Sequence, residues 1–312
     1  MDFKNKRIGV LMGGWSPERE ISLKSGKKVA ESLKRQGFKV VEIDVGHNLA
    51  DVLEKEKIDI AFIALHGVPG EDGTVQGLLE ILGIPYTGSG VMASAISINK
   101  IITKVILQAS RIRVPRYIKL QIDFKKAIEK IGGPPWIVKP VSCGSSVGVE
   151  IVKEPEALES TFNRIKEKYQ DAFIEEFIQG REITVGILGE DVLPVVEHVP
   201  KSEFFDYRAK YTPGVTEEII PAKLPERVYK EAQSFALRSH RAIGCNSFSR
   251  VDMMVKDNKV WVLELNSIPG LTDISVLPAE AEQSGISYDE VIYRILESAI
   301  QRDSKYQNPN SK

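Results

Sequence analysis

The chain contains 312 residues, of which 42% are hydrophobic and 27% are charged, as is typical of a water-soluble globular protein of two or three domains. Its 42 Lys and Arg residues balance 43 Asp and Glu residues, so a broad basic surface for nucleic acid is excluded. Two cysteines cannot form a disulfide framework, and no apolar stretch approaches the roughly 20 residues of a membrane span. We expect a cytoplasmic protein with neither nucleic acid nor a membrane as its partner.

The first third alternates short apolar segments with amphipathic ones. The segment at residues 58–65 is almost entirely apolar, which is typical of a parallel strand that is buried on both faces. This alternation predicts an open parallel sheet with its ligands outside the carboxyl ends of the strands. The loops at those ends carry Glu18 and His66. The strands are expected at residues 7–12, 38–45, 58–65 and 84–87.

The remainder of the chain predicts two further domains. After a helix at residues 91–110, short strands and helices indicate a small α+β domain, and longer strands with a polar loop at 201–219 follow it. A helix is expected at residues 226–243, a two-strand hairpin at 249–265 and a last helix at 288–300. The predicted division is 1–98, 99–180 and 181–312.

The most specific chemical signal is Arg250-Val-Asp252 followed by Glu264-Leu-Asn266. Residues two apart in a strand share a face, so each pair projects to one side while apolar neighbours face the other. Carboxylate and amide oxygens suit Mg²⁺ shared with substrate phosphates. Asp252 and Glu264 lie on the same side of the hairpin only if the loop is odd in length or a bulge intervenes. The alternative is a half-exposed hairpin with a polar face.

A second signal is the Gly/Ser-rich segment from Lys139 to Gly148, which includes Ser145 and Ser146. Backbone N–H groups and hydroxyls in such a loop can contact phosphate oxygens, and Lys139 adds a positive charge. The pattern GxxxxGK[ST] is absent, so this is not a P-loop. A simple hairpin turn is an equally good interpretation of this segment alone.

Two weaker signals lie in the first third. His66 opens a Gly-rich loop directly after a buried strand, where a substrate-binding role is about as probable as a structural one. Residues 88–93 match the dinucleotide fingerprint GxGxxG/A. No acidic strand end follows about 20 residues later, so a tight turn before a helix is favoured there.

Taken together, these motifs resemble the D-alanine–D-alanine ligase family of the ATP-grasp superfamily. They occur in the family order and cover nearly the whole chain. Asn99 stands where Asp is common in the family, and Cys143 where Glu is common. The stretches that carry the resemblance are residues 13–22, 66–77, 85–90, 139–148, 205–211, 250–252 and 264–272.

The resemblance implies an α/β and α+β, three-domain ATP-grasp architecture. It has an N-terminal open parallel sheet, a small central α+β domain and a C-terminal domain with a mainly antiparallel sheet. The implied reaction joins two D-alanines for peptidoglycan synthesis in the cell wall. The first D-alanine's carboxylate attacks the γ-phosphate of ATP, and the second D-alanine's amine displaces phosphate from the resulting acyl phosphate. The implied cofactors are ATP as co-substrate and Mg²⁺ or Mn²⁺, as two ions.

The resemblance also implies residue roles. The metal ligands are Asp252, Glu264 and Asn266. The ATP contacts are Lys100, Lys139, Ser145, Ser146 and Lys210 for the phosphates, Glu175, Glu176, Phe177 and Ile178 for adenine, and Glu182 for ribose. The substrate contacts are Glu18 for the first ammonium, Arg250 and the Gly270 amide for the acyl phosphate, and Ser275 and Val276 for the second carboxylate. The trio that closes the loop at 201–219 over the site is Glu18, Ser145 and Tyr211.

The expected partners are D-alanine, ATP and a second copy of the chain in a homodimer. Two alternatives stay open. The chain could use D-serine or D-lactate as the second substrate, or it could bind nucleotide without catalysis.

Overall fold

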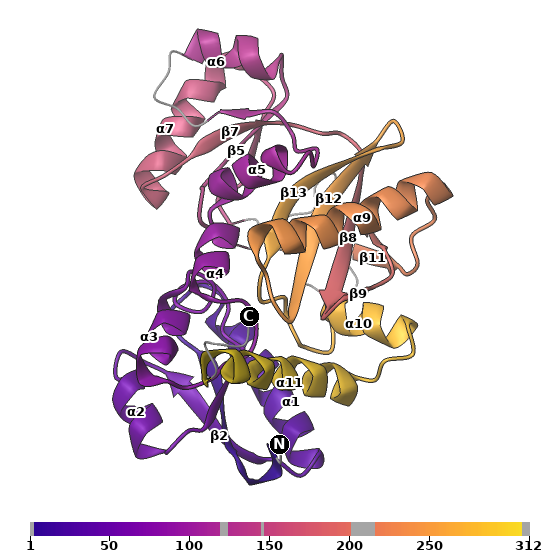
Figure 1. The fold of residues 1–312 in the computed structure, drawn as a ribbon. Helices are drawn as coiled ribbons and strands as arrows, with labels where there is room; N and C mark the ends of the chain where they lie inside the picture. The colour runs from indigo at the N-terminus through magenta and orange to yellow at the C-terminus, as the bar shows by residue number, and fades with distance from the viewer. Residues whose placement is uncertain (1–2, 119–123, 145–146, 201–215, 308–312) are drawn as a thin grey trace.

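The computed structural model describes residues 3–118, 124–144, 147–200 and 216–307, and it contains three separate sheets (Figure 1). The strands of the three sheets follow one another along the chain. This arrangement confirms the expected α/β and α+β architecture.

The first sheet is parallel, with the strand order β2-β1-β3. All four residues of β3 are buried, as the apolar run at 58–65 predicts. The expected strand at 84–87 is reduced to one bridge between Ala61 and Tyr86. The elements of this part are β1 (Arg7–Gly13), α1 (Arg19–Arg35), β2 (Lys39–Val45), α2 (Leu49–Lys55), β3 (Ile60–Ile63) and α3 (Thr74–Leu82), after a short 3-10 turn at Phe3–Asn5.

The helix expected at residues 91–110 is instead two helices, α4 (Val91–Ile98) and α5 (Lys100–Ala109), which meet at an angle of 103°. The break lies at Asn99, whose side-chain oxygen accepts a hydrogen bond from the Ile102 N–H and so caps α5. Within the described residues no single helix is long and apolar enough to cross a membrane, although this bent pair meets the length and composition requirement together.

The second sheet is small and antiparallel, with the order β4-β7-β5-β6. Its apolar side packs against α7 and α6 around the fully buried Trp136. The elements are β4 (Tyr117–Ile118), α6 (Phe124–Ile131), β5 (Trp136–Lys139), β6 (Glu150–Val152), a 3-10 turn at Pro155–Ala157, α7 (Leu158–Tyr169) and β7 (Phe173–Glu176).

The third sheet is antiparallel, with the order β11-β10-β8-β12-β13 and with β9 beside β8, and α9 covers one face. Residues 216–219, expected as the end of a polar loop, form its edge strand β11; residues 201–215 lie outside the described part. The elements are β8 (Arg181–Leu188), β9 (Asp191–Val192), β10 (Val196–Pro200), β11 (Thr216–Ile219), α9 (Glu226–Ile243), β12 (Phe248–Lys256), β13 (Lys259–Asn266), α10 (Val276–Gln283) and α11 (Tyr288–Gln307).

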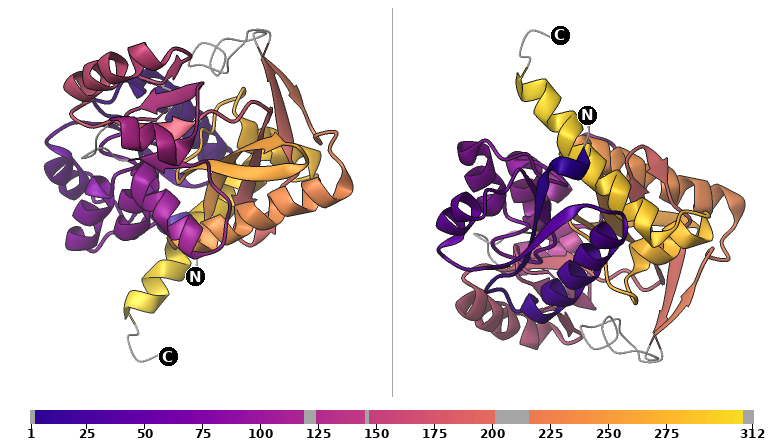
Figure 2. Two further views of the ribbon diagram at one scale, coloured as in Figure 1. Left: turned by 90° about the horizontal axis from the view of Figure 1, so that it is seen from above. Right: turned by 90° about the horizontal axis from the view of Figure 1, so that it is seen from below.

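The last helix returns to the first sheet. α11 lies beside α1, and Val291, Ile292, Ile295 and Leu296 are fully buried in the same apolar cluster as β1 and β3 (Figure 2). The C-terminal helix therefore packs on the N-terminal part of the chain. This packing holds the segment between β13 and α11 against that part. That segment contains Gly270 and Ser275.

Candidate active site

A cavity with a volume of about 570 Å³ lies between the N-terminal part, the loop after β5 and the third sheet. Its lining comes from α1 and the residue before it, from the loop after β3, from the end of α4, from α5 and from the loop between β5 and β6. It also includes residues of β10 to β13 and of α10, and the loop that follows β13. Of the predicted site residues, it brings together Glu18, His66, Lys100, Arg250, Asp252, Glu264, Asn266, Gly270, Ser275 and Val276.

The β12/β13 hairpin places the two predicted metal carboxylates opposite each other. Its turn has two residues, Asp257 and Asn258, both with positive φ, as type I′ hairpins require. A two-residue turn alone would put Asp252 and Glu264 on opposite faces. The register shifts by one residue between Asp252 and Met253, so that Asp252 pairs with Glu264. This bulge confirms the condition that the sequence set for a shared face.

The carboxylates are held by charged and hydroxyl neighbours. Asp252 accepts hydrogen bonds from Arg250 Nε (2.8 Å) and Nη2 (2.9 Å) and from the Thr184 hydroxyl (2.6 Å). Lys100 Nζ lies 3.3 Å from Glu264 Oε2 and donates to the Cys143 carbonyl at 2.5 Å. These donors hold the two carboxylates in place, and both side chains line the cavity. The ligand atoms that they offer there are carboxylate oxygens.

This donor set fits a divalent cation that is shared with phosphate. Asn266 pairs with Arg250 across the hairpin, and its Oδ1 accepts from the Ile268 N–H at 2.9 Å, which fixes the amide's orientation. Among the described residues no three His, Cys, Asp or Glu side chains form a closed metal cage. Two carboxylates and one amide leave coordination positions for phosphate oxygens, which is the arrangement that Mg²⁺ prefers at nucleotide sites.

A smaller cavity of about 70 Å³ continues from this one between the second and third sheets. It shares Lys100, Asp252 and Glu264 with the large cavity, so the two cavities adjoin at the predicted phosphate and metal residues. Its apolar walls include Met254 and Leu263, which suit a planar ring. The predicted nucleotide residues that line it are Lys139, Glu176, Phe177, Ile178 and Glu182.

The side chain of Glu175 lies outside both cavities. It is fully buried and forms ion pairs with Lys104 and with Lys139, the latter at 2.6 Å. Burial by itself would raise the pKa of Glu175, but the two ammonium groups lower it below its usual value. Burial lowers the pKa of Lys104 to about 8. Lys139, predicted to contact phosphate, is thus anchored by a buried carboxylate.

The other end of the cavity carries a different charge pattern. His66 is buried, its Nε2 lies 3.1 Å from the Ser25 hydroxyl, and burial lowers its pKa, so the imidazole is neutral. Glu71 accepts from the Gly67 N–H at 2.6 Å. Desolvation, followed by the charge of Glu18, raises the pKa of Glu71 to about 8. Glu18, His66 and Glu71 therefore lie together at this end of the cavity, and His66 and Glu71 are held in their neutral forms.

The loop between β13 and α10 is shaped around Ser275. Its hydroxyl accepts from the Thr272 N–H at 2.9 Å. A Cβ on Gly270 would lie 2.7 Å from the Ser275 hydroxyl oxygen, so a side chain here would displace that hydroxyl. The Gly270 backbone therefore lies close to the Ser275 side chain, and both residues line the cavity.

Several predictions cannot be compared with the structure. Ser145, Ser146, Lys210 and Tyr211 lie outside the described residues. Sequence reasoning also missed cavity or network residues. Glu71 belonged to a motif that was noticed but was given no role, whereas Lys104, His198 and Glu218 belong to no motif and are brought to the site only by packing.

The site and the three-sheet fold define an ATP-grasp protein, and comparison with known proteins gives its family. The D-ala D-ala ligase N-terminus family matches residues 46–89, and the D-ala D-ala ligase C-terminus family matches residues 106–297. A D-alanine–D-alanine ligase of Geotalea uraniireducens is 46% identical over 97% of this chain and 99% of its own length. That of Citrifermentans bemidjiense is 48% identical over 96% of this chain and 97% of its own length. The chain therefore belongs to the D-alanine–D-alanine ligase family.

Solved structures agree with this assignment. The D-alanine–D-alanine ligase of Bacillus anthracis complexed with ATP superposes with a TM-score of 0.86 at 35% identity, covering 96% of this chain and 99% of that chain. The VanG D-Ala:D-Ser ligase of Enterococcus faecalis superposes with a TM-score of 0.80 at 29% identity, covering 95% of this chain and all of that chain.

Proposed function

We infer that this chain joins two D-alanines in an ATP-dependent ligation that yields D-alanyl-D-alanine, ADP and phosphate for peptidoglycan synthesis. The observation that carries this inference is the near full-length identity of 46–48% to D-alanine–D-alanine ligases. The large cavity supports it, because it gathers predicted substrate residues, the predicted phosphate residue Lys100 and the three predicted metal ligands. In the first step a carboxylate oxygen bonds to the γ-phosphorus and ADP leaves. In the second the amine nitrogen bonds to the acyl carbon, phosphate leaves and the nitrogen loses a proton.

At the phosphate end, Lys100 and Lys139 contact ATP oxygens, and Asp252, Glu264 and Asn266 would hold Mg²⁺ or Mn²⁺ as two ions. Such ions would supply positive charge to neutralise the transferring phosphoryl group. The backbone of Glu175, Glu176, Phe177 and Ile178 contacts adenine, and Glu182 binds ribose. All of these except Glu175 line the smaller cavity. The chain divides functionally at 98/99 and 180/181, with ATP between the last two parts.

At the amino-acid end, the Glu18 carboxylate binds the first D-alanine's ammonium, and neutral His66 lies beside it without repelling that cation. Arg250 and the Gly270 N–H stabilise negative charge on the acyl phosphate and its tetrahedral adduct, as an oxyanion hole does. Ser275 and Val276 receive the second carboxylate. The Glu18–Ser145–Tyr211 trio and Lys210 close over the site, which protects the acyl phosphate from water.

The test is phosphate release from Mg-ATP with D-alanine, L-alanine, D-serine or D-lactate, combined with the product's mass. D-alanine-dependent release with a D-alanyl-D-alanine product is the expected result. A mixed product would favour a D-serine or D-lactate ligase, a class represented among the structural relatives by the VanG D-Ala:D-Ser ligase. Nucleotide binding without phosphate release from any of the four would favour a non-catalytic module.

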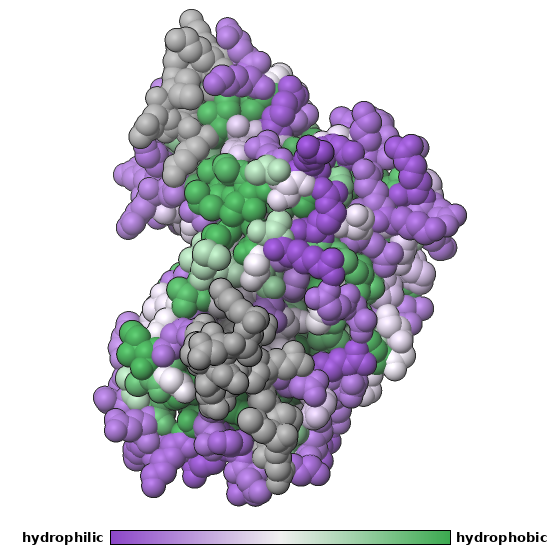
Figure 3. Space-filling view, viewed as in Figure 1, coloured by the Kyte–Doolittle hydropathy of each residue, from purple (hydrophilic) through white to green (hydrophobic). Residues whose placement is uncertain are grey.

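A homodimer is supported by an apolar area on the face over α3, α4 and α5 (Figure 3). The side chains of Ile81 and Met92 are 85% and 70% exposed, and an exposed patch of this kind is typical of an interaction surface. Light scattering of the wild type and of Met92→Glu tests the dimer, because a buried charge would dissociate it.

Because ATP is the phosphoryl donor, the reaction takes place in the cytoplasm.

A further inference from the structure

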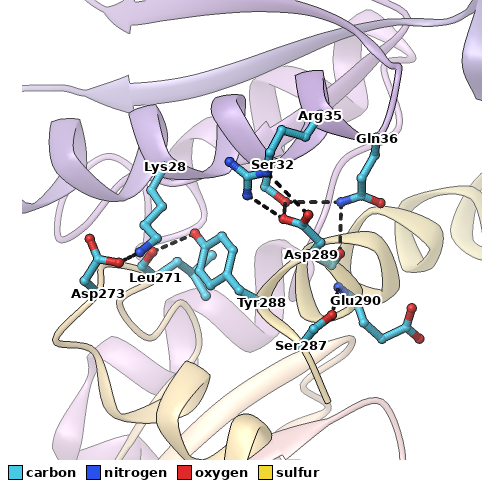
Figure 4. A network of polar contacts seen from close by, with 10 residues as sticks. All are labelled: Lys28, Ser32, Arg35, Gln36, Leu271, Asp273, Ser287, Tyr288, Asp289 and Glu290. Carbon is cyan, nitrogen blue, oxygen red and sulfur yellow. Dashed lines mark hydrogen bonds and ion pairs between the residues drawn. The ribbon is translucent and has the colours of Figure 1, made fainter. Parts of the chain in front are cut away.

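A polar network joins α1 to the start of α11 (Figure 4). The Asp289 carboxylate accepts hydrogen bonds from the Ser32 hydroxyl and from Arg35 Nη2, both at 2.6 Å. Gln36 Nε2 donates to the Asp289 carbonyl at 2.9 Å. Hydrogen bonding to Arg35 lowers the pKa of Asp289, so the carboxylate is ionised. The first turn of α11 is therefore fixed on α1.

Tyr288 extends this anchor to the loop that follows β13. Its hydroxyl donates to the Leu271 carbonyl at 2.8 Å, and its ring lies 5.0 Å from Lys28 Nζ. Lys28 also forms an ion pair with Asp273 in the same loop. Burial raises the pKa of Tyr288, so its hydroxyl keeps the proton that it donates.

The opposite side of the same residue is held from α1. The Leu271 N–H points to the Ser25 hydroxyl at 3.4 Å, and Ser25 in turn contacts His66. The Leu271 side chain is only 1% exposed. Both backbone polar groups of this residue are thus fixed, one by α1 and the other by α11, and rotation of its peptide groups would break one of these bonds.

Leu271 lies between the two groups assigned to the second half of the reaction. Gly270 precedes it directly, and Thr272, which follows it, holds the Ser275 hydroxyl. We propose that Tyr288 is a positioning residue: its hydroxyl bond to Leu271 sets the distance between the Gly270 N–H and the Ser275 pocket, and thereby the affinity for the second D-alanine. This inference rests on the proposed function of that loop.

The test is Tyr288→Phe, which removes the hydroxyl and keeps the ring against Lys28. One neutral hydrogen bond that orients a binding loop is worth about a fivefold change in affinity. The KM for the second D-alanine, resolved from the velocity curve, should rise about fivefold. The KM values for the first D-alanine and for ATP should stay within about twofold, because Glu18 and the nucleotide residues do not depend on this bond.

Tyr293→Phe is the matched control. It makes the same chemical change five positions further along α11, where Tyr293 packs against the same apolar cluster and its hydroxyl bonds to no other described residue. This variant should leave all three KM values unchanged. Tyr288→Phe should also speed hydrogen exchange of the amides in residues 268–276, measured without any substrate.

Unchanged KM values with unchanged exchange would overturn the proposal, as would an equal rise in the KM values for both D-alanines and ATP. If the wild type forms no dipeptide, the proposed function fails instead. The exchange measurement then still decides whether Tyr288 holds the loop. If loop exchange rises while the second KM stays constant, Tyr288 stabilises the loop without positioning the substrate, and the proposal is wrong.

Discussion

Buried titratable groups are charged at one end of this site and neutral at the other. The first end, around Glu175 and Lys139, is the proposed nucleotide end, and the second, around His66 and Glu71, is the proposed amino-acid end. At the nucleotide end, Glu175 is fully buried, yet it keeps its charge between the ammonium groups of Lys104 and Lys139. At the amino-acid end, His66 is kept neutral by burial, and Glu71 has a pKa of about 8 because it is desolvated beside Glu18. The nucleotide end therefore keeps its buried groups ionised through ion pairs, whereas burial at the amino-acid end favours the neutral forms of His66 and Glu71.

This difference in charge fits the ligands that we propose for each end. ATP phosphates carry several negative charges and need lysines that stay protonated, and a buried counter-ion achieves that for Lys139. A D-alanine zwitterion brings one positive and one negative group. If Glu18 binds the ammonium as proposed, neither His66 nor Glu71 adds a competing full charge beside it. Four substitutions test this contrast, ordered from the largest expected effect to the smallest.

Lys104→Met should be the most damaging change to stability. It leaves Glu175 with one partner instead of two and removes the ammonium that donates to the Leu263 carbonyl at 2.9 Å. Breaking a buried ion pair on one side costs about 3–5 kcal/mol. Urea unfolding measures it, with Lys230→Met in an exposed pair as the control. A loss below about 1 kcal/mol would mean that Lys139 alone satisfies Glu175.

Glu264→Gln should abolish most activity while leaving the fold intact. The amide keeps the shape of the side chain but loses the charge that lies 3.3 Å from Lys100 Nζ and that we propose holds the cation. Removing one electrostatic contact to a reacting centre typically costs a factor of about 100 or more. Phosphate release over a series of Mg²⁺ concentrations measures the loss, and Glu282→Gln on the exposed side of α10 is the control. Activity within tenfold of wild type would remove Glu264 from the metal site.

Glu71→Gln should change the pH dependence of stability. The folded-state pKa of Glu71 is raised to about 8, so the folded state binds this proton more tightly than the unfolded state does. The contribution is therefore complete below the unfolded pKa of about 4.5 and is lost as pH rises toward 8. The wild type should lose stability relative to Glu71→Gln across this window, by at most about 1.4 kcal/mol per pH unit.

Urea unfolding at pH 5, 6 and 7.5 measures this difference. Glu282→Gln, an exposed acid-to-amide change on α10, should follow the wild type at all three pH values. A free-energy difference between wild type and Glu71→Gln that stays constant with pH would show that Glu71 is ionised throughout and that the suppressed charge belongs to another group.

The parts that the sequence predicted best are local. The hairpin that bears Asp252 and Glu264 follows from a period of two and a short turn, and its bulge is one of the two conditions under which the sequence places both carboxylates on one face. The all-buried β3 likewise follows from its own composition. Such features depend on neighbouring residues in the chain, where the side-chain pattern carries the information.

The parts that the sequence did not predict depend on distant contacts. The pairing of Lys104 with Glu175 joins α5 to β7, and α11 packs on the first sheet, at the opposite end of the chain. No periodicity records which distant charge a lysine will meet. The break at Asn99 was missed for another reason: residues 91–110 are apolar enough on both sides of the break that the pattern fits one continuous helix.

The substitution Asn99→Ala, at the break between α4 and α5, should have the smallest effect of the four. Asn99 ends α4 in an extended conformation, and its Oδ1 accepts from the Ile102 N–H at 3.1 Å, so alanine loses the cap of α5 and about 1 kcal/mol of stability. The next residue is Lys100, which reaches Glu264 and the Cys143 carbonyl. Fraying of this turn should therefore also raise the KM for ATP. Asn99→Asp, the residue common in the family, keeps an acceptor at the helix N-terminus and should match the wild type in urea unfolding and in KM. If Asp proves as harmful as Ala, the cap is not what Asn99 contributes, and the amide's own donor group must be holding the bend.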